Sequence, residues 1–367
     1  MEQTSSDNAS KSTEMKIRRL FIYPIKSMLP VEVSMAEITS AGFRFDRQYA
    51  VVKTPTEGQR LVQHLTIKKT YRLALFQPSI NDDWSELGIK CTTAPSDAGI
   101  TLPLTPSPLT GLNAKSYTLS IFGTTAVGMD MGDGPANFFS KHLDISVRLV
   151  FISGNGSREI PGIAYIPKQL TSLTVNTGED AQPQRIRFAD AAPFLVTSTA
   201  SEKEMIARLP PKYRDEDVML QLRPNIHIDV GPQTKAFEED DWRELVVDGA
   251  DGGYKATLRC VFMTPRCLSL NVDIKTGTTS PREKQLYGLL AKDRRVNKVF
   301  PQKPVFGQYA FAAPIGAIIR VGDTVNVTDK AAQVSEPQDT AMQGATTARE
   351  GEKELHQSAT AEQVQVK

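Results

Sequence analysis

One cysteine lies where a reactive thiol is expected. Residues 256–263 alternate apolar and polar side chains like a β-strand, and the segment that follows, ending in Arg266 and Cys267, leaves that strand in a predicted loop. Positive charge beside a thiol favours the thiolate, which binds soft metals, so Arg266 supports a chemical role for Cys267. An isolated cysteine is more often inert, and its position alone does not decide between the two. We expect Cys260, inside the strand, to be a core residue, and Cys91 has no predicted role.

Cationic residues beside predicted turns form a second pattern. They are Lys26 next to Ser27, Arg47 after Asp46, Arg223 before Pro224-Asn225, and Arg266. Each alone is an ordinary solvated charge. Together they suit an anionic ligand, because guanidinium and ammonium groups donate well to phosphate and to polar heterocycle edges. A thiolate on a neighbouring loop would supply a soft ligand for a metal carried by the same molecule.

Composition and missing motifs exclude several other classes of protein. Lys and Arg number 43 against 42 Asp and Glu, so the chain has no field of one sign to attract nucleic acid. It contains no CxxC, HExxH, P-loop or strand-flanked GxGxxG motif, which argues against zinc, NTPase and nicotinamide sites. Three unevenly spaced cysteines and a polar start predict a soluble, cytoplasmic protein. We expect no integral membrane segment, since no apolar run approaches about 20 residues.

The elements that must position these residues are mainly strands. In the first section, β-rich runs between turn residues predict strands at 17–25, 31–39, 48–53, 73–77 and 117–122. In the second, we expect strands at 147–152, 224–230, 245–247, 256–263 and 318–327, among helices at 134–143, at 202–209 and after residue 280. Ser201 is the predicted N-cap of the second helix, and Ser280 with Pro281 opens the third.

These runs indicate an α+β, β-dominated fold with a few helices. We predict a barrel or curled sheet over residues 15–130 and a second, strand-dominated α+β section over 131–329. Residues 1–14 and 330–367 are polar and poor in large apolar side chains, so we expect disordered tails. The proline-rich stretch 94–113 is predicted to be a surface insertion between strands.

Short blocks in a fixed order carry a family resemblance. The amino-terminal blocks are Ile22-Tyr23-Pro24-Ile25-Lys26-Ser27 and Phe45-Asp46-Arg47. Downstream come Pro193-Phe194-Leu195, Arg223-Pro224-Asn225-Ile226, Pro265-Arg266-Cys267, Val272-Asp273 with Thr276-Gly277, Phe306-Gly307-Gln308-Tyr309 and Val321-Gly322-Asp323. From about residue 16 to about residue 328 the chain therefore resembles MOSC-domain proteins of the mitochondrial amidoxime-reducing-component type. This resemblance implies an N-terminal β-barrel domain over residues 15–130, packed on a MOSC β-barrel domain over 131–329 whose core spans about 185–328.

The resemblance implies a molybdopterin cofactor, the Mo-molybdopterin form of the molybdenum cofactor, between the two domains. Its metal would be bound by two dithiolene sulfurs and by Cys267. The residues matching those that hold the pterin and its phosphate are Lys26, Ser27, Arg47, Arg223 and Asn225, while Arg266 and Tyr309 match residues close to the metal. The chain departs from the family at Ala191, Ala192, Leu270 and Asn271, which replace hydroxyl-bearing residues, so a cofactor hydrogen bond is in doubt there.

The same resemblance implies an oxidoreductase that removes oxygen from N-oxygenated substrates, such as N-hydroxylated amidines. The chain has no haem, iron–sulfur or dinucleotide motif, so electrons must come from outside. By resemblance the donor is cytochrome b5 with its reductase. A mitochondrial association is compatible with this family.

Two other functions stay open. The chain could be a non-catalytic cofactor carrier or sulfur-handling module, because MOSC domains also end molybdenum-cofactor sulfurases. There they follow a pyridoxal-phosphate-binding domain, for which we expect no room here. A cofactor-free barrel with a structural role is the third interpretation.

Overall fold

Alternating burial shows how the longest strands present one face to a core. The computed structural model describes residues 14–59, 61–106, 115–152, 157–159 and 185–331. In β18 (Tyr254–Pro265), every second side chain from Ala256 through Leu258 to Cys260 is buried. This two-residue repeat is the one that places successive strand side chains on opposite faces of a sheet. The core prediction for Cys260 is therefore confirmed.

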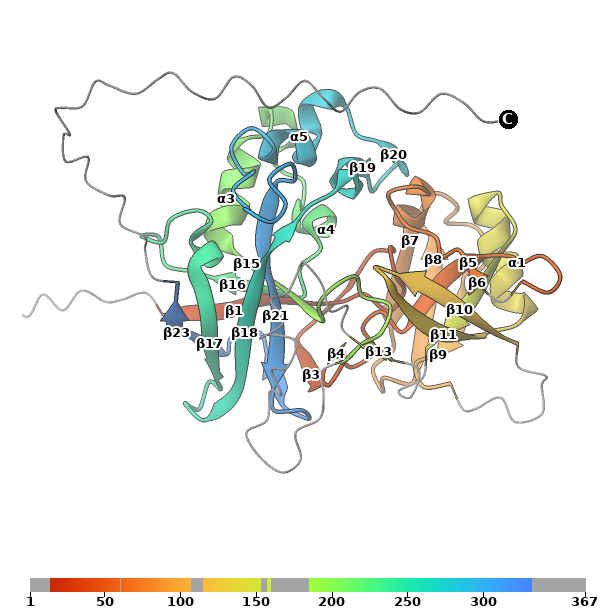
Figure 1. The fold of residues 1–367 in the computed structure, drawn as a ribbon, viewed down its shortest axis with the longest axis horizontal. Coiled ribbons are helices and arrows are strands. Elements are labelled where there is room, and N and C mark those ends of the chain that lie inside the picture. Colours follow the sequence, from red (N-terminus) through yellow and green to blue (C-terminus); the bar gives the residue numbers. More distant parts are fainter. Residues whose placement is uncertain (1–13, 60, 107–114, 153–156, 160–184, 332–367) are drawn as a thin grey trace, which may run out of the picture. The chain divides into compact units, whose positions relative to one another are not determined.

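Seven strands close into a barrel, because each is hydrogen-bonded to the next and the last returns to the first (Figure 1). Their order is β1 (Met15–Ile22), β16 (Ile226–Asp229), β15 (Phe194–Ser198), β21 (Val305–Ala313), β18, β17 (Trp242–Asp248) and β23 (Thr324–Lys330). β15 and β16 are parallel, and the other neighbours are antiparallel. The short β2 (Val31–Val33) extends from β1.

Further sheets are built mainly from the part of the chain before residue 152. A five-stranded sheet has the order β5 (Tyr49–Lys53), β12 (Val147–Phe151), β11 (Thr124–Asp130), β10 (Ser116–Ile121) and β6 (Leu61–Val62). Helix α1 (Asp133–Leu143) packs on β12. The remaining strands are β7 (Phe76–Ile80), β8 (Glu86–Cys91), β9 (Ile100–Pro103), β3 (Met35–Thr39), β4 (Gly42–Phe43), β22 (Ile318–Arg320), β13 (Arg158–Glu159), β14 (Arg185–Ile186), β19 (Val272–Asp273) and β20 (Thr278–Thr279).

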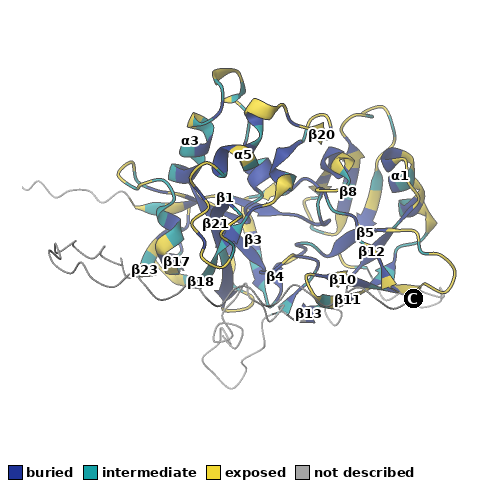
Figure 2. Cartoon of the chain, turned by 45° about the horizontal axis from the view of Figure 1, so that its top comes forward, coloured by how far each residue is buried: buried dark blue, intermediate teal, exposed yellow. Residues whose placement is uncertain are grey.

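A second apolar cluster lies outside the barrel, beneath three short helices. They are α3 (Thr199–Ala207), α4 (Met219–Leu222) and α5 (Leu286–Leu290), and Figure 2 shows buried residues of α3 and α5 in dark blue. The cluster joins Phe21, Tyr23, Met205, Leu209, Val218, Met219, Leu222, Leu270, Leu286, Leu289, Leu290 and Phe306. Single 3-10 turns η1 (Tyr71–Leu75), η3 (Pro211–Tyr213), η4 (Glu238–Asp241), η5 (Leu268–Asn271) and η6 (Arg282–Lys284) connect the elements.

The predicted α+β, β-dominated fold is confirmed. β1 lies at the start of the chain yet closes the barrel between β16 and β23, whereas β12 pairs with β5 and β11. A strand from the first half of the chain thus belongs to the barrel built mostly from the second half, and β12 belongs to a sheet built mostly from the first half. The predicted boundary between residues 130 and 131 stays a prediction. No helix in the described ranges is long and apolar enough to cross a membrane.

Several local predictions were wrong. Residues 73–77 begin in the 3-10 turn η1, where three consecutive side chains are buried, and only their end belongs to β7. The N-cap of α3 is Ser198, which accepts from the backbone N–H of Ser201, while the Ser201 hydroxyl bonds to the carboxylate of Glu239 instead. The predicted third helix is a 3-10 turn followed by the five-residue α5.

The stretch 94–113 was also predicted incompletely, because it contains β9, which pairs with β8. Its residues 107–113 lie outside the described part of the chain, as do residues 1–13 and 332–367 of the predicted tails.

Candidate functional site

One pocket collects all eight residues that the sequence proposed for a site. It encloses about 760 Å³ of space, part of it open to solvent, and most of its lining lies on or near five neighbouring barrel strands: β1, β16, β15, β21 and β18. The lining includes Lys26, Ser27, Arg47, Arg223, Asn225, Arg266, Cys267 and Tyr309, together with Ile67, Ala189, Asp190, Ala192, Phe194, Leu195, Thr264, Pro265 and Ser269. Residues up to 283 positions apart in the chain, Lys26 and Tyr309, thus face one space.

Three of the pocket residues have left-handed backbones. The φ angles of Ser27, Arg47 and Arg223 are 70°, 48° and 61°. Such angles are unfavourable for residues with a Cβ and persist only where surrounding contacts hold them. Arg223 ends α4 in this conformation, and the N–H of Arg47 donates to the carbonyl of Tyr23 at 2.7 Å. The unfavourable backbone angles of Arg47 and Arg223 occur in turns that place both guanidinium groups in the pocket.

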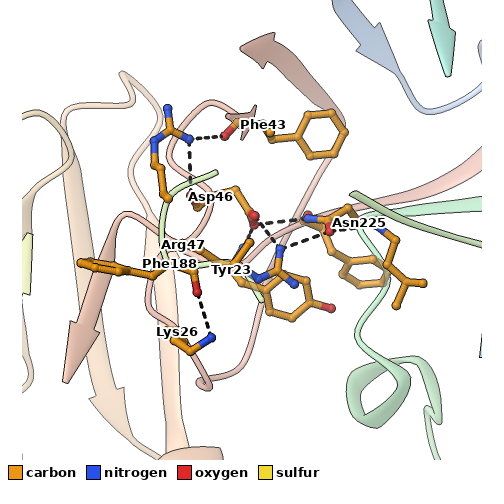
Figure 3. A network of polar contacts seen from close by, with 12 residues as sticks. Tyr23, Lys26, Phe43, Asp46, Arg47, Phe188 and Asn225 are labelled. Carbon is orange, nitrogen blue, oxygen red and sulfur yellow. Dashed lines mark hydrogen bonds and ion pairs between the residues drawn. The ribbon is translucent and has the colours of Figure 1, made fainter. Parts of the chain in front are cut away.

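Asp46 is the centre of the polar network behind the pocket (Figure 3). Its carboxylate is 1% exposed and accepts from the backbone N–H of Tyr23 at 2.8 Å and from Nδ2 of Asn225 at 3.3 Å. Nη1 of Arg47 donates to the same carboxylate at 2.5 Å and to Oδ1 of Asn225 at 3.2 Å. Burial opposes the charge of Arg47, but Asp46, with smaller contributions from Tyr23 and Asp190, raises the pKa of Arg47. Arg47 and Asn225 are therefore fixed before any ligand arrives.

Arg223 and Arg266 are held differently. The guanidinium of Arg223 lies 4.4 Å from the ring centroid of Tyr23, and its Nη1 donates to the carbonyl of Met28 at 2.7 Å. Nη2 of Arg266 donates to the carbonyl of Leu222 at 2.6 Å. Within the described residues neither guanidinium forms a salt bridge. Burial lowers the pKa of Arg223 to about 10 and also lowers the pKa of Arg266.

The pocket consequently holds more positive than negative charge. Lys26 pairs with Asp190 and Arg47 pairs with Asp46, whereas the two remaining arginines of the pocket have no carboxylate partner in the described ranges. Four cations face two carboxylates, which leaves an excess of two positive charges. Partly desolvated charge of one sign is costly, and a bound anion lowers that cost.

Cys267 is the exposed one of the chain's three cysteines, and Cys91 and Cys260 are buried. Burial raises the pKa of Cys260 to about 12, which makes that thiol inert. Cys267 sits just before η5, and its Sγ lies 3.1 Å from Oγ of Ser269. In the described part of the chain, no three His, Cys, Asp or Glu side chains group as metal ligands. A metal at Cys267 would need its other ligands from the molecule that carries it.

Asp190 and Thr264 are among the pocket residues that escaped the sequence analysis. Asp190 pairs with Lys26 and lies just ahead of the block that begins at Pro193. Thr264 precedes Pro265, is 2% exposed, and its Oγ1 has no hydrogen-bond partner among the described residues. Both residues adjoin recognised blocks, and this adjacency is the one signal that the sequence offered.

The four departures from the family pattern lie in two different places. Ala192 lines the pocket, and Ala191 beside it is buried. Leu270 belongs to the apolar cluster under the helices instead. Asn271 donates to Gln285 at 3.2 Å and its Oδ1 accepts from the backbone of Tyr287 at 3.0 Å. Of the four positions, Ala192 alone lines the pocket and can contact a ligand there.

Comparison with known proteins gives this geometry a family. Residues 14–146 match the MOSC N-terminal beta barrel domain, and residues 183–326 match the MOSC domain. The chain is 30% identical to mitochondrial amidoxime reducing component 2 of Rattus norvegicus and 28% identical to mitochondrial amidoxime-reducing component 1 of Homo sapiens, each over 84% of this chain and 82% of the relative. It is 25% identical to molybdenum cofactor sulfurase of Danio rerio over 75% of this chain and 30% of that one. The predicted family is confirmed, and the chain belongs to the MOSC-domain family of the mitochondrial amidoxime reducing components.

Proposed function

We propose that this protein is a molybdenum-cofactor enzyme that reduces N-oxygenated compounds, with Cys267 as the protein ligand of the metal. One observation carries the proposal: a pocket with an excess of two positive charges has the chain's exposed cysteine in its wall. An anionic molecule that brings its own metal satisfies both features. The names of the amidoxime-reducing relatives supply the substrate class.

The residues present fit such a cofactor. Arg223 and Arg266 retain N–H donors for a phosphate, since a guanidinium carries five and each uses one for a carbonyl in the described structure. The hydroxyl of Thr264 is buried without a partner, and a ligand in the pocket would supply one. Cys267 offers one soft ligand in a place that solvent reaches. When bound, the cofactor supplies two-electron oxygen-atom transfer.

Each side chain then has a distinct task. Asp46 holds Arg47 and Asn225 in fixed directions, so these two orient the ligand without reorganising. Burial raises the pKa of Tyr309, so its hydroxyl keeps its proton at neutral pH and can donate a hydrogen bond to substrate oxygen. Arg266 lies next to Cys267 and places a cation beside the proposed metal ligand. Lys26 and Ser27 also line the pocket.

Electrons would come from an external carrier, for which we propose cytochrome b5 with its reductase. The small N-oxygenated substrate and this carrier are the expected partners. An intracellular site of action, cytoplasmic or mitochondrial, belongs to the same proposal, because several relatives are named mitochondrial.

The test measures metal first and turnover second. Wild type, Cys267→Ser and the matched control Cys91→Ser are expressed in a host that makes the cofactor, and their molybdenum content is measured. We expect near-stoichiometric metal in wild type and control and little in Cys267→Ser. Wild type and control, once pre-reduced, should then convert benzamidoxime to benzamidine without air. Equal, negligible metal in all three would favour a cofactor-free barrel.

A cofactor-carrier function is the second candidate, because the chain also resembles a molybdenum cofactor sulfurase. A carrier must release its ligand. Full metal content, no turnover of any N-oxygenated compound, and rapid transfer of cofactor to an apo-enzyme would favour the carrier over the reductase.

A further inference from the structure

Asp190 occupies the place in the pocket where an incoming anion would meet Lys26. Nζ of Lys26 donates to Oδ1 of Asp190 and, at 2.8 Å, to the carbonyl of Phe188. Lys26 is 6% exposed, so the anions that can reach its ammonium are those that enter through this pocket. Asp190 lies in the same pocket wall and is therefore in direct competition with any such anion.

The two carboxylates of the site differ in how firmly they are held. Asp46 is buried at 1% exposure and accepts from three donors, so it is a permanent part of the protein. The Asp190 side chain is 49% exposed, and its salt bridge to Lys26 is its one ion pair among the described residues. It lies on the bent segment before β15, outside regular secondary structure. A rotation into solvent would release it, whereas releasing Asp46 would break the network.

We propose that Asp190 is a replaceable counter-ion, which neutralises Lys26 in the cofactor-free protein and gives up that position when the anionic group of the ligand binds. This inference rests on the proposed function for the identity of the natural ligand. A phosphate at Lys26 would otherwise face a carboxylate within hydrogen-bonding range, and two like charges at such a distance repel strongly. Asp190 thus neutralises Lys26 in the empty pocket, and this lowers the affinity of the pocket for an anion.

The carboxylate is ionised in the empty pocket. Desolvation by the surrounding protein acts to raise the pKa of Asp190, but the charge and hydrogen bond of Lys26, together with the charges of Arg47 and Arg158, hold the pKa below its usual range. Conversely, burial lowers the pKa of Lys26, and Asp190 is the group that opposes this. Removing the Asp190 carboxylate should therefore lower the stability of the cofactor-free protein and raise its affinity for anions.

The experiment uses inorganic phosphate and pyrophosphate as probes, with full-length protein made in a host that lacks the cofactor. Binding is measured by titration calorimetry, and the melting temperature is followed against phosphate concentration. Asp190→Asn should bind the probes about tenfold more tightly than wild type, a change of about 1.4 kcal/mol. Its melting temperature should be lower without phosphate and rise more steeply with phosphate. Asp190→Glu should behave like wild type.

Two controls make the result specific. Asp215→Asn changes the same charge at an exposed position away from the pocket and should leave phosphate affinity unchanged. In a Lys26→Met background, Asp190→Asn should give no further gain, because the proposed competition runs through Lys26.

Unchanged phosphate affinity in Asp190→Asn would overturn the inference, as would an equal gain in the Lys26→Met background. These outcomes are independent of the metal analysis. A protein that takes up no molybdenum yet gains phosphate affinity on Asp190→Asn would refute the proposed function and support this inference.

Discussion

Replacing Arg223 by Gln should leave the cofactor-free protein about as stable as the wild type, although Arg223 lies in the pocket wall and lacks most of its contact with water. The expectation follows from its missing counter-ion. No salt bridge holds Arg223 in the described structure, so its buried charge destabilises the folded protein until an anionic ligand binds. The same substitution should remove most of the molybdenum from protein made in a cofactor-producing host.

The magnitude can be worked from the contacts. Burial lowers the pKa of Arg223 to about 10. A tenfold change in proton affinity equals about 1.4 kcal/mol, so folding costs the charged form on the order of 3 kcal/mol at neutral pH. The substitution removes this cost, together with a charged hydrogen bond to Met28 of about 1.5 to 3 kcal/mol and stacking over Tyr23 of about 1 kcal/mol. The terms nearly cancel, and the change should stay within about 1 kcal/mol.

Arg47 offers a matched comparison. It is another pocket arginine with a left-handed backbone, and its guanidinium also lies over Tyr23, at 4.7 Å from the ring centroid. It differs from Arg223 in having a buried carboxylate partner, Asp46. Arg47→Gln leaves that carboxylate without its cation, which should cost about 3 to 5 kcal/mol.

The assay is urea unfolding of both variants and wild type, all without cofactor, at one neutral pH. We expect a difference of about 3 kcal/mol between the two substitutions, with Arg47→Gln the less stable protein. If Arg223→Gln lost as much stability as Arg47→Gln, Arg223 would be a structural residue and the argument from uncompensated charge would be refuted.

Three further predictions concern other groups. Iodoacetamide should modify Cys267 in the native, cofactor-free protein and spare Cys91 and Cys260, as peptide mass spectrometry would show; modification of all three at similar rates would contradict the exposure argument. Thr264→Val should leave the cofactor-free protein equally stable or about 1 kcal/mol more stable, because it removes an unpartnered buried hydroxyl, and should lower molybdenum content; a loss of stability would reveal a hidden partner. Burial raises the pKa of Glu239 to about 7, so the stability that its neutral form contributes is complete below about pH 4.5 and is lost as the pH rises to about 7. Wild type should therefore lose about 2 to 3 kcal/mol more than Glu239→Gln between pH 5 and pH 8 in urea unfolding, and parallel curves would contradict the assigned pKa.

The candidate site could be predicted because its residues fall in short blocks whose order resembles a family. Lys26 and Cys267 are separated by more than 200 residues. Nothing in local periodicity brings such positions together. Their contact depends on barrel closure, in which β1 pairs with β16 and β23 from the far end of the chain. Residue chemistry alone suggested an anionic ligand and a soft metal, and the resemblance supplied the identity of both.

The failures have a common physical cause. Ser198 and Ser201 are equally good N-caps by residue type, and the carboxylate of Glu239, which binds both hydroxyls, is a tertiary partner that decides their roles. The missing partner of Thr264 and the half-exposed salt bridge of Asp190 are likewise properties of packing. Neighbouring blocks pointed toward these residues, yet burial and pairing decide what they do.

Paired and unpaired cations of the pocket have different functions. The paired Arg47 stabilises the fold, whereas the unpaired Arg223 and Arg266 serve mainly to bind a ligand. Arg47 and Asp46 form a complete network that links the turn after β4 to the residues just before β16, and it is as useful to the empty protein as to the loaded one. Arg223 and Arg266 contribute little to the stability of the empty protein. Desolvation opposes their charge, and no carboxylate in the described residues forms a salt bridge with either. Strands of a closed barrel cannot move apart to relieve such repulsion, so the pocket keeps its charge and geometry fixed. A bound anion relieves this unfavourable electrostatic energy, and the relief adds to the free energy of binding. Substitutions at the unpaired cations should therefore abolish binding without unfolding the protein, whereas a substitution at Arg47, whose partner Asp46 is buried, should lower both binding and stability.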